Sequence, residues 1–132
     1  MSIVAIDVGL KRIGAAVYLE NVIVPLDAIL RRNRVQAARD ISTLLREYKA
    51  EILVAGLSAN DEMQRRIRHF VSLLEFDGEI AFTDEDFSSC EAKERMKGVV
   101  KQKRDGRVDS LAAMIILERY LQNRLSKPAE KY

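Results

Sequence analysis

Residues 3–17 decide the fold and read Ile3-Val4-Ala5-Ile6-Asp7-Val8-Gly9-Leu10-Lys11-Arg12-Ile13-Gly14-Ala15-Ala16-Val17. The apolar, largely β-branched run before Asp7 is typical of a strand buried on both faces of a sheet. Gly9 permits a tight turn, and a second apolar run follows so soon that the two should pair as an antiparallel hairpin. A carboxylate inside an apolar run is costly to bury unless a cation compensates it. We therefore expect Asp7 to anchor a site.

The rest of the chain alternates between strand and helix patterns, and Pro25 in the third apolar run indicates an edge strand. A strand, a helix and a second buried strand in that order imply a crossover connection and parallel pairing. The sequence thus predicts an α/β domain with a mixed five-stranded sheet flanked by helices. The expected strands are 3–7, 13–19, 22–26, 52–55 and 80–83; the expected helices follow Asn33 and Asn60, run from Ser88 to about Lys97, and run from Arg107 to about Leu125.

Length and composition limit the possibilities. The 132 residues suit one domain over 1–125, followed by a polar tail over 126–132. A formal charge of +2 gives no strong global field, so only local clusters of charge could favour nucleic acid. The N-terminus shows no targeting leader, no run reaches the length of a membrane span, and Cys90 is a single cysteine. We expect a soluble, cytoplasmic protein with no membrane partner.

Three acids stand at the ends of expected elements. Asp7 ends the first strand, Glu85 follows the last strand, and Asp109 lies in the first turn of the final helix. Functional groups gather at strand ends in open sheets, so Asp7 and Glu85 could lie side by side if their strands are neighbours. Three ionised carboxylates repel one another unless a hard divalent cation binds them through oxygen. The pattern therefore indicates a site for Mg²⁺ or Mn²⁺.

Each acid also has a plainer interpretation, and spacing alone does not choose between them. Asp7 could satisfy backbone donors in the glycine turn, and Glu85 could be one of several solvated acids. Asp109 could serve only to start a helix. His69 lies among arginines in the second expected helix, where an exposed surface role is the natural interpretation.

Four segments of the chain form a recognisable set of motifs in a fixed order. They are Asp7-Val8-Gly9-Leu10-Lys11-Arg12-Ile13-Gly14-Ala15-Ala16-Val17, Val54-Ala55-Gly56-Leu57, Asp84-Glu85-Asp86-Phe87-Ser88-Ser89 and Val108-Asp109-Ser110-Leu111-Ala112-Ala113. With these segments the chain resembles the YqgF/RuvX family of bacterial proteins. The likeness runs from the first strand to the last helix, and the Lys-Arg-Ile-Gly that follows the Asp-x-Gly turn is its most specific part.

The resemblance implies a ribonuclease H-like fold, a cytoplasmic location and nuclease activity in processing the 5′ end of the 16S ribosomal RNA precursor, a step of ribosome biogenesis. Family members are also labelled Holliday junction resolvases, which makes four-way DNA the alternative substrate. The family's three acids correspond to Asp7, Glu85 and Asp109. The chain departs from the family where Asp86 replaces a usual arginine and Ser58 replaces a usual proline.

The implied mechanism is metal-assisted hydrolysis of a phosphodiester, with cations holding the substrate backbone. Each basic residue proposed for this role could equally be a surface side chain that contacts only water. The near absence of aromatic residues for stacking leaves RNA and DNA undistinguished. The candidate nucleic-acid-binding residues are Lys11 and Arg12 at the hairpin turn, and Lys101, Lys103, Arg104 and Arg107 in a basic loop before Asp109.

Two rival functions follow from the same residues. Actin-like ATPases also begin with an acid-glycine hairpin, but they need two related domains, and 132 residues are too few for both. A noncatalytic nucleic-acid-binding module is the second rival, and Asp86 is the residue that favours it. The chain could be a monomer or a homodimer, because a resolvase must cut two symmetric strands whereas an RNA end-processing nuclease need not.

Overall fold

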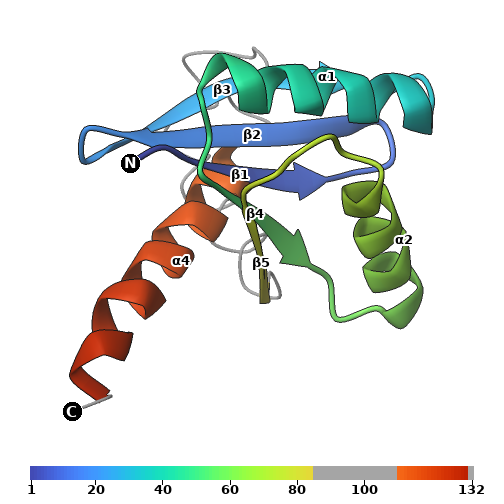
Figure 1. Ribbon diagram of the computed structural model, residues 1–132. Helices are drawn as coiled ribbons and strands as arrows, with labels where there is room; N and C mark the ends of the chain where they lie inside the picture. Colours follow the sequence, from blue (N-terminus) through green and yellow to red (C-terminus); the bar gives the residue numbers. More distant parts are fainter. Residues whose placement is uncertain (85–109, 131–132) are drawn as a thin grey trace, which may run out of the picture.

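The computed structural model describes residues 1–84 and 110–130, in which five strands form one mixed sheet (Figure 1). The strand order is β3-β2-β1-β4-β5, with β1 at the centre. β1 pairs with β2 antiparallel and with β4 parallel, which confirms the predicted hairpin and crossover. The strands are β1 (Ile3–Val8), β2 (Arg12–Leu19), β3 (Val22–Leu30), β4 (Ile52–Leu57) and β5 (Glu79–Asp84).

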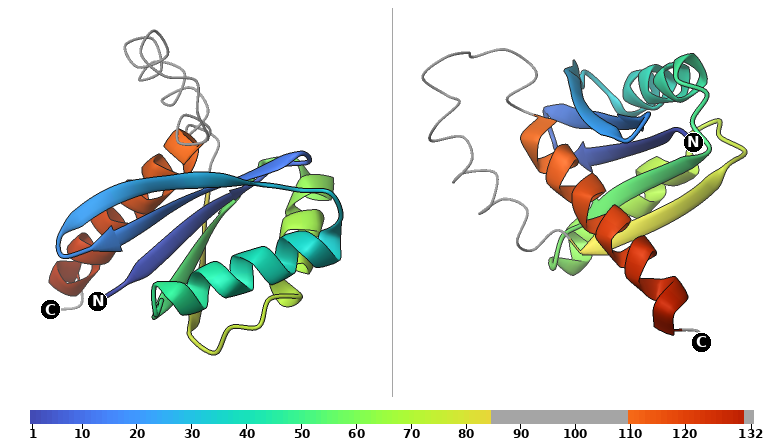
Figure 2. Two further views of the ribbon diagram at one scale, coloured as in Figure 1. Left: turned by 90° about the horizontal axis from the view of Figure 1, so that it is seen from above. Right: turned by 90° about the vertical axis from the view of Figure 1, so that its left-hand side faces the viewer.

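Helices cover both faces of the sheet (Figure 2). The helices α1 (Arg34–Glu47) and α2 (Asp61–Ser72) pack on one face, and α4 (Leu111–Glu130) packs on the other. No helix in the described part of the chain is long and apolar enough to cross a membrane.

The start of α1 confirms the expected cap at Asn33. The Asn33 side chain accepts a hydrogen bond from the Gln36 N–H at 2.8 Å, and the Gln36 side chain accepts one from the Asn33 N–H at 3.4 Å. This reciprocal capping box satisfies donors that a helix start otherwise leaves without partners.

Side chains of β1 alternate between two apolar cores. Val4 and Ile6 belong to the core under α1 and α2, whereas Ile3 and Ala5 belong to the core under α4. All four are fully buried, as expected for a central strand covered on both faces. The same alternation directs Asp7, two residues after Ala5, to the α4 face of the sheet.

One hydroxyl group attaches the start of α4 to the sheet. Ser110 is fully buried, and its Oγ accepts a hydrogen bond from the Ala15 N–H at 3.0 Å and donates one to the Leu26 carbonyl at 2.6 Å. Ala15 and Leu26 are register partners on β2 and β3, next to an irregularity in the pairing between Ile13 and Ala15. The hydroxyl therefore bridges two strands where their ladder is disturbed.

Strand β3 is longer than expected. The sequence predicts an end at Leu26, but the strand continues to Leu30, because a bulge lets Ile29 and Leu30 pair with Ile13 and Arg12. Such an irregularity breaks the simple alternation on which the prediction relied. Pro25 does lie on an edge strand, as predicted.

The final helix ends later than expected. Its backbone runs to Glu130, whereas the sequence predicts an end near Leu125. Pro128 lies in the last turn, where a missing N–H removes only one of the few remaining helical bonds, so it does not stop the helix at Leu125. The helix expected from Ser88 to about Lys97 and the basic loop after it lie outside the described residues.

Replacing Ser110 tests the attachment of α4. Ser110→Ala leaves the Ala15 N–H and the Leu26 carbonyl without their buried partner, so the free energy of unfolding should fall by about 1–3 kcal/mol. The measurement is urea unfolding followed by circular dichroism. Ser72→Ala, at an exposed position, is the control and should change the stability by less than about 0.5 kcal/mol. Equal stability of the two variants would show that the bridge contributes nothing.

Candidate functional site

Asp7 lies near the end of the central strand with glycines on both neighbouring strands. On β2 its register partner is Gly14. On β4, Ile6 pairs with Ala55 in parallel register, so the next residue of β4, Gly56, lies beside Asp7. Neither neighbour has a side chain that could lie beside the carboxylate, and a glycine inside a strand often marks the close approach of another group.

The row continues to Thr83 on β5, which is the register partner of Gly56. The alternation that puts Ala81 in the α4 core puts Thr83 on the same face as Asp7. Its Oγ1 is buried and has no hydrogen-bond partner in the described part of the chain. A buried hydroxyl without a partner is uncommon and is often found at functional sites.

The carboxylate of Asp7 is only partly buried. It forms no hydrogen bond or ion pair with any other residue in 1–84 or 110–130. A partly desolvated carboxylate without a compensating donor favours the approach of a cation. Within those same ranges, no group of three or more His, Cys, Asp or Glu side chains could hold a metal. Of the three acids that the sequence indicates as a metal site, Asp7 alone lies among the described residues.

The strand that carries Asp7 and the strand that precedes Glu85 are not neighbours in the sheet. β4 lies between β1 and β5, so the condition under which these two acids would be adjacent is not met. Two strand spacings of about 4.8 Å separate the two strands by about 10 Å. The carboxyl ends of β1, β4 and β5 nevertheless lie at one end of the sheet, because these three strands are parallel. Glu85 lies outside the described residues, directly after β5.

Asp109 also lies outside the described residues, but the residue after it is anchored close to Asp7. Ser110 binds the Ala15 N–H, and Ala15 is the register partner of Ile6 on β1. The start of α4 is therefore one strand from β1, on the face toward which Asp7 is directed. The chain order alone did not reveal this proximity.

Lys11 and Arg12 are exposed in the hairpin turn that begins two residues after Asp7. The turn is closed by a hydrogen bond of 3.0 Å from the Gly9 N–H to the Arg12 carbonyl. The structure thus brings two of the six predicted cations to the edge that carries Asp7. The other four, Lys101, Lys103, Arg104 and Arg107, lie outside the described residues.

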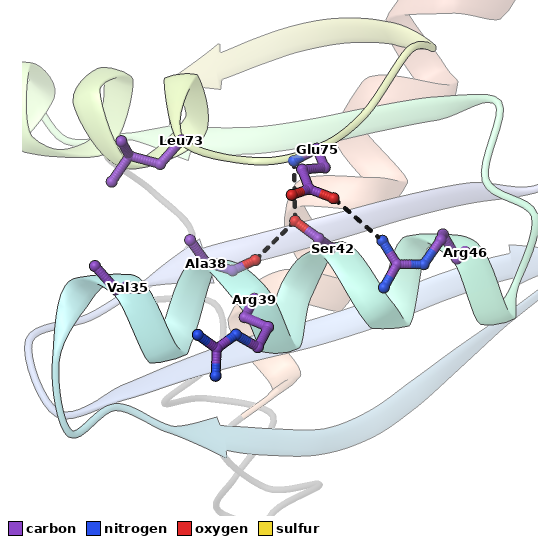
Figure 3. A pocket seen from close by; sticks show the side chains of 7 residues that line it. All are labelled: Val35, Ala38, Arg39, Ser42, Arg46, Leu73 and Glu75. Carbon is purple, nitrogen blue, oxygen red and sulfur yellow. Dashed lines mark hydrogen bonds and ion pairs between the residues drawn. The ribbon is translucent and has the colours of Figure 1, made fainter.

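A hollow of about 270 Å³ lies between α1 and the end of α2, away from Asp7 and its neighbours on the adjacent strands (Figure 3). Its one carboxylate, Glu75, pairs with Arg46 at 3.7 Å, and the Glu75 N–H donates to the Ser42 hydroxyl at 3.0 Å. The hollow opens on the α1 and α2 face, opposite the face of Asp7. It is not part of the candidate site.

The chain matches a known protein family over most of its length. The family model RuvX, described as Holliday junction resolvase, matches residues 1–123. The chain belongs to the RuvX family. A relative from Sulfurovum sp. (strain NBC37-1) is 53% identical over 126 residues, covering 92% of this chain and 98% of the relative. One from Sulfurimonas denitrificans is 48% identical, covering 94% and 99%. Both are named "Putative pre-16S rRNA nuclease".

Two solved structures illustrate the likeness of this RuvX chain to known folds. Thermus thermophilus RuvC, determined in complex with a Holliday junction substrate, aligns with a TM-score of 0.60 at 13% identity, covering 92% of this chain and 95% of that one. The fowlpox virus Holliday junction resolvase aligns with a TM-score of 0.54 at 14% identity, covering 95% and 99%. At such low identity the likeness shows the fold, which is ribonuclease H-like, as the family resemblance implied.

Sequence reasoning assigned no role to the two glycines beside Asp7. Gly14 and Gly56 each lie inside an apolar run, where a glycine weakens a strand and often marks the close approach of another group. That signal was present in the sequence of this RuvX chain. Only the register shows that both glycines flank the same carboxylate.

The turn beside Asp7 should not tolerate a side chain at Gly9. A Cβ there would lie 2.6 Å from the Arg12 carbonyl oxygen, so Gly9→Ala must open the turn. We expect a loss of about 1–3 kcal/mol in the free energy of unfolding, measured by chemical denaturation. Leu10→Ala is the matched control in the same turn, because Leu10 is 63% exposed and should contribute little. A Gly9 variant as stable as the Leu10 variant would contradict the steric argument.

Proposed function

We propose that the chain is a metal-dependent nuclease that hydrolyses phosphodiester bonds, and that its reaction is 5′-end processing of pre-16S rRNA. One observation carries the proposal: Asp7 is a partly buried carboxylate between two strand glycines, without a partner among the described residues. It lies at the edge where β5 ends and on the face where α4 begins. The names of the close relatives support the choice of substrate.

The proposed metal ligands are Asp7, Glu85 and Asp109, and the proposed ion is Mg²⁺ or Mn²⁺. Carboxylate oxygens are the donors that these hard cations prefer. The glycine neighbours of Asp7 and the buried Thr83 hydroxyl fit a site that admits an ion and its oxygen ligands. Such an ion would activate water for attack and neutralise charge on the phosphate.

The protein's own residues have the tasks of holding and orienting the substrate. Lys11 and Arg12 would neutralise backbone phosphates beside Asp7, and Lys101, Lys103, Arg104 and Arg107 are proposed to extend that contact. These interactions position a nucleic acid without reading its sequence. A substrate chosen by structure, such as a precursor end, is consistent with them.

Holliday junction resolution is the second candidate, because the matching family model carries that description. A resolvase cuts two symmetric strands and therefore requires a dimer. A monomer that cleaves RNA would contradict resolution, whereas a dimer that cuts four-way DNA symmetrically would contradict RNA processing. A protein that binds nucleic acid and cleaves neither substrate with either metal would be the noncatalytic module.

The decisive variant is Asp7→Asn. It removes a proposed metal ligand while keeping the shape of the side chain, so cleavage should fall at least about a hundredfold. The assay compares a 5′-extended precursor RNA with a four-way DNA junction, each with Mg²⁺ and with Mn²⁺. Thermal unfolding should be unchanged or shifted upward, because removing an uncompensated carboxylate does not weaken the fold.

Asp61→Asn is the matched control. Asp61 begins α2, soon after the carboxyl end of β4, and it is exposed where Asp7 is partly buried. Its cleavage rate should equal that of the unmodified protein. A second measurement is thermal stabilisation by Mn²⁺, which should appear in the Asp61 variant and disappear in the Asp7 variant. Full activity of Asp7→Asn would refute the assignment of the site.

A further inference from the structure

Three arginines gather where β3 ends and α1 begins. Arg31 follows the last residue of β3, Arg32 comes next, and Arg34 is the first residue of α1. β3 and β1 are both antiparallel to β2, so they run in the same direction and end at the same edge of the sheet. The arginines therefore lie at the same end of the sheet as Asp7. Arg34 begins α1, which packs on the face opposite the one toward which Asp7 is directed. A nucleic acid that contacts both must cross this end of the sheet.

Arg31 joins this segment to the hairpin turn. Its N–H donates to the Lys11 carbonyl at 2.8 Å, and its Nη1 donates to the Gly9 carbonyl at 3.0 Å. Its guanidinium also lies over the ring of Phe70, 5.5 Å from the centroid. These three contacts fix the position of Arg31 and connect the end of β3 to the hairpin turn. Phe70 belongs to the core under α1 and α2, so the Arg31 guanidinium lies on that face of the sheet.

The cations at the start of α1 oppose the stability of that helix. A positive charge near a helix N-terminus costs about 0.3–1 kcal/mol, because the N-terminal end of the helix dipole is itself positive. α1 has no acid in its first turn, whereas the first turn of α2 contains Asp61 and Glu62. The exposed Arg32 and Arg34 side chains form no ion pair within the described residues. A cluster that works against local stability indicates a function.

The two helix starts at this end of the sheet differ in charge. Lys11, Arg12 and the three arginines lie near the start of α1, whereas α2 begins with Asp61 and Glu62, of which Glu62 pairs with Arg66 at 3.0 Å. Of these two helix starts, that of α1 is therefore the one that attracts an anionic chain. Gly9, which binds Arg31, is two residues from Asp7, or about 7 Å along an extended chain.

We propose that Lys11, Arg12, Arg31, Arg32 and Arg34, here called the β3-side basic surface, bind the phosphodiester backbone of a nucleic acid and guide it to Asp7. The inference rests on the proposed nuclease function and adds Arg31, Arg32 and Arg34 to the basic residues that the sequence indicated. DNA carries one charge per about 3.4 Å of each strand, so a surface of this extent meets several phosphates at once. The contact is independent of sequence, because phosphates carry no base identity.

The test is the double substitution Arg32→Gln, Arg34→Gln, made in an Asp7→Asn background so that substrates stay intact. Affinity for a fluorescent 30-nucleotide single-stranded RNA and for a four-way DNA junction is measured by anisotropy over a range of salt concentrations. At low salt the affinity should fall about tenfold or more. The slope of log affinity against log salt should shrink by about 1.4 for single strands and about 1.8 for duplex arms.

Thermal unfolding separates binding from folding. The double variant should unfold at the same temperature as its parent or a higher one, because it removes cations from a helix N-terminus. The matched control is Arg46→Gln, Arg124→Gln, which removes the same charge near the ends of α1 and α4 away from Asp7. Those arginines lie in exposed ion pairs with Glu75 and Glu79, so their loss costs little stability. The control should keep both the affinity and the salt slope.

The possible results distinguish the two proposals. If the unmodified protein cleaves and the double variant binds like the control, the basic surface is refuted and the nuclease stands. If binding and its salt slope fall as stated but the unmodified protein cleaves nothing, the surface stands and the nuclease is refuted. If the unmodified protein binds neither probe, both are refuted. A larger loss on one probe identifies whether RNA or branched DNA uses the surface.

Discussion

The hydroxyl of Ser110 is the contact on which the arrangement of this domain depends. It connects residues separated by 84 and 95 positions in the chain, and it does so inside the sheet. A helix packed only through apolar side chains can shift along a sheet at modest cost, since apolar contacts have no direction. A buried hydroxyl that both accepts and donates adds a directional constraint, because moving it would leave the Ala15 N–H and the Leu26 carbonyl without their partner. The start of α4 is thereby held on the face of Asp7.

The candidate site is built from small residues as much as from charged ones. Gly14 and Gly56 flank a single carboxylate, and Ala5 and Ala16 belong to the apolar core on the same face of the sheet. A surround of low dielectric constant would strengthen an interaction of Asp7 with a cation. The charged residues near Asp7, such as Lys11 and Arg12, are exposed at the end of the sheet, where water hydrates them.

Much of this could be predicted from the sequence, and the failures have physical causes. Hydrophobic periodicity predicted the hairpin, the crossover and the edge position of Pro25, because each depends on local pattern. It misjudged the end of β3, because a bulge restored pairing after an apparent stop at Leu26. Asp7 was found because a lone acid in an apolar run is conspicuous. Its glycine neighbours and the proximity of Ser110 depend on register and long-range contact, which periodicity does not contain.

The cap of α1 has a consequence for variation at position 33. Asn33 holds the helix start through a neutral amide, although Asp would cap it about equally well. An aspartate there would place a full negative charge between Arg32 and Arg34 and cancel part of their attraction for an anion. In other members of the family, the uncharged caps Ser and Thr should therefore exchange freely with Asn at this position, and Asp should be rare wherever the flanking arginines are kept.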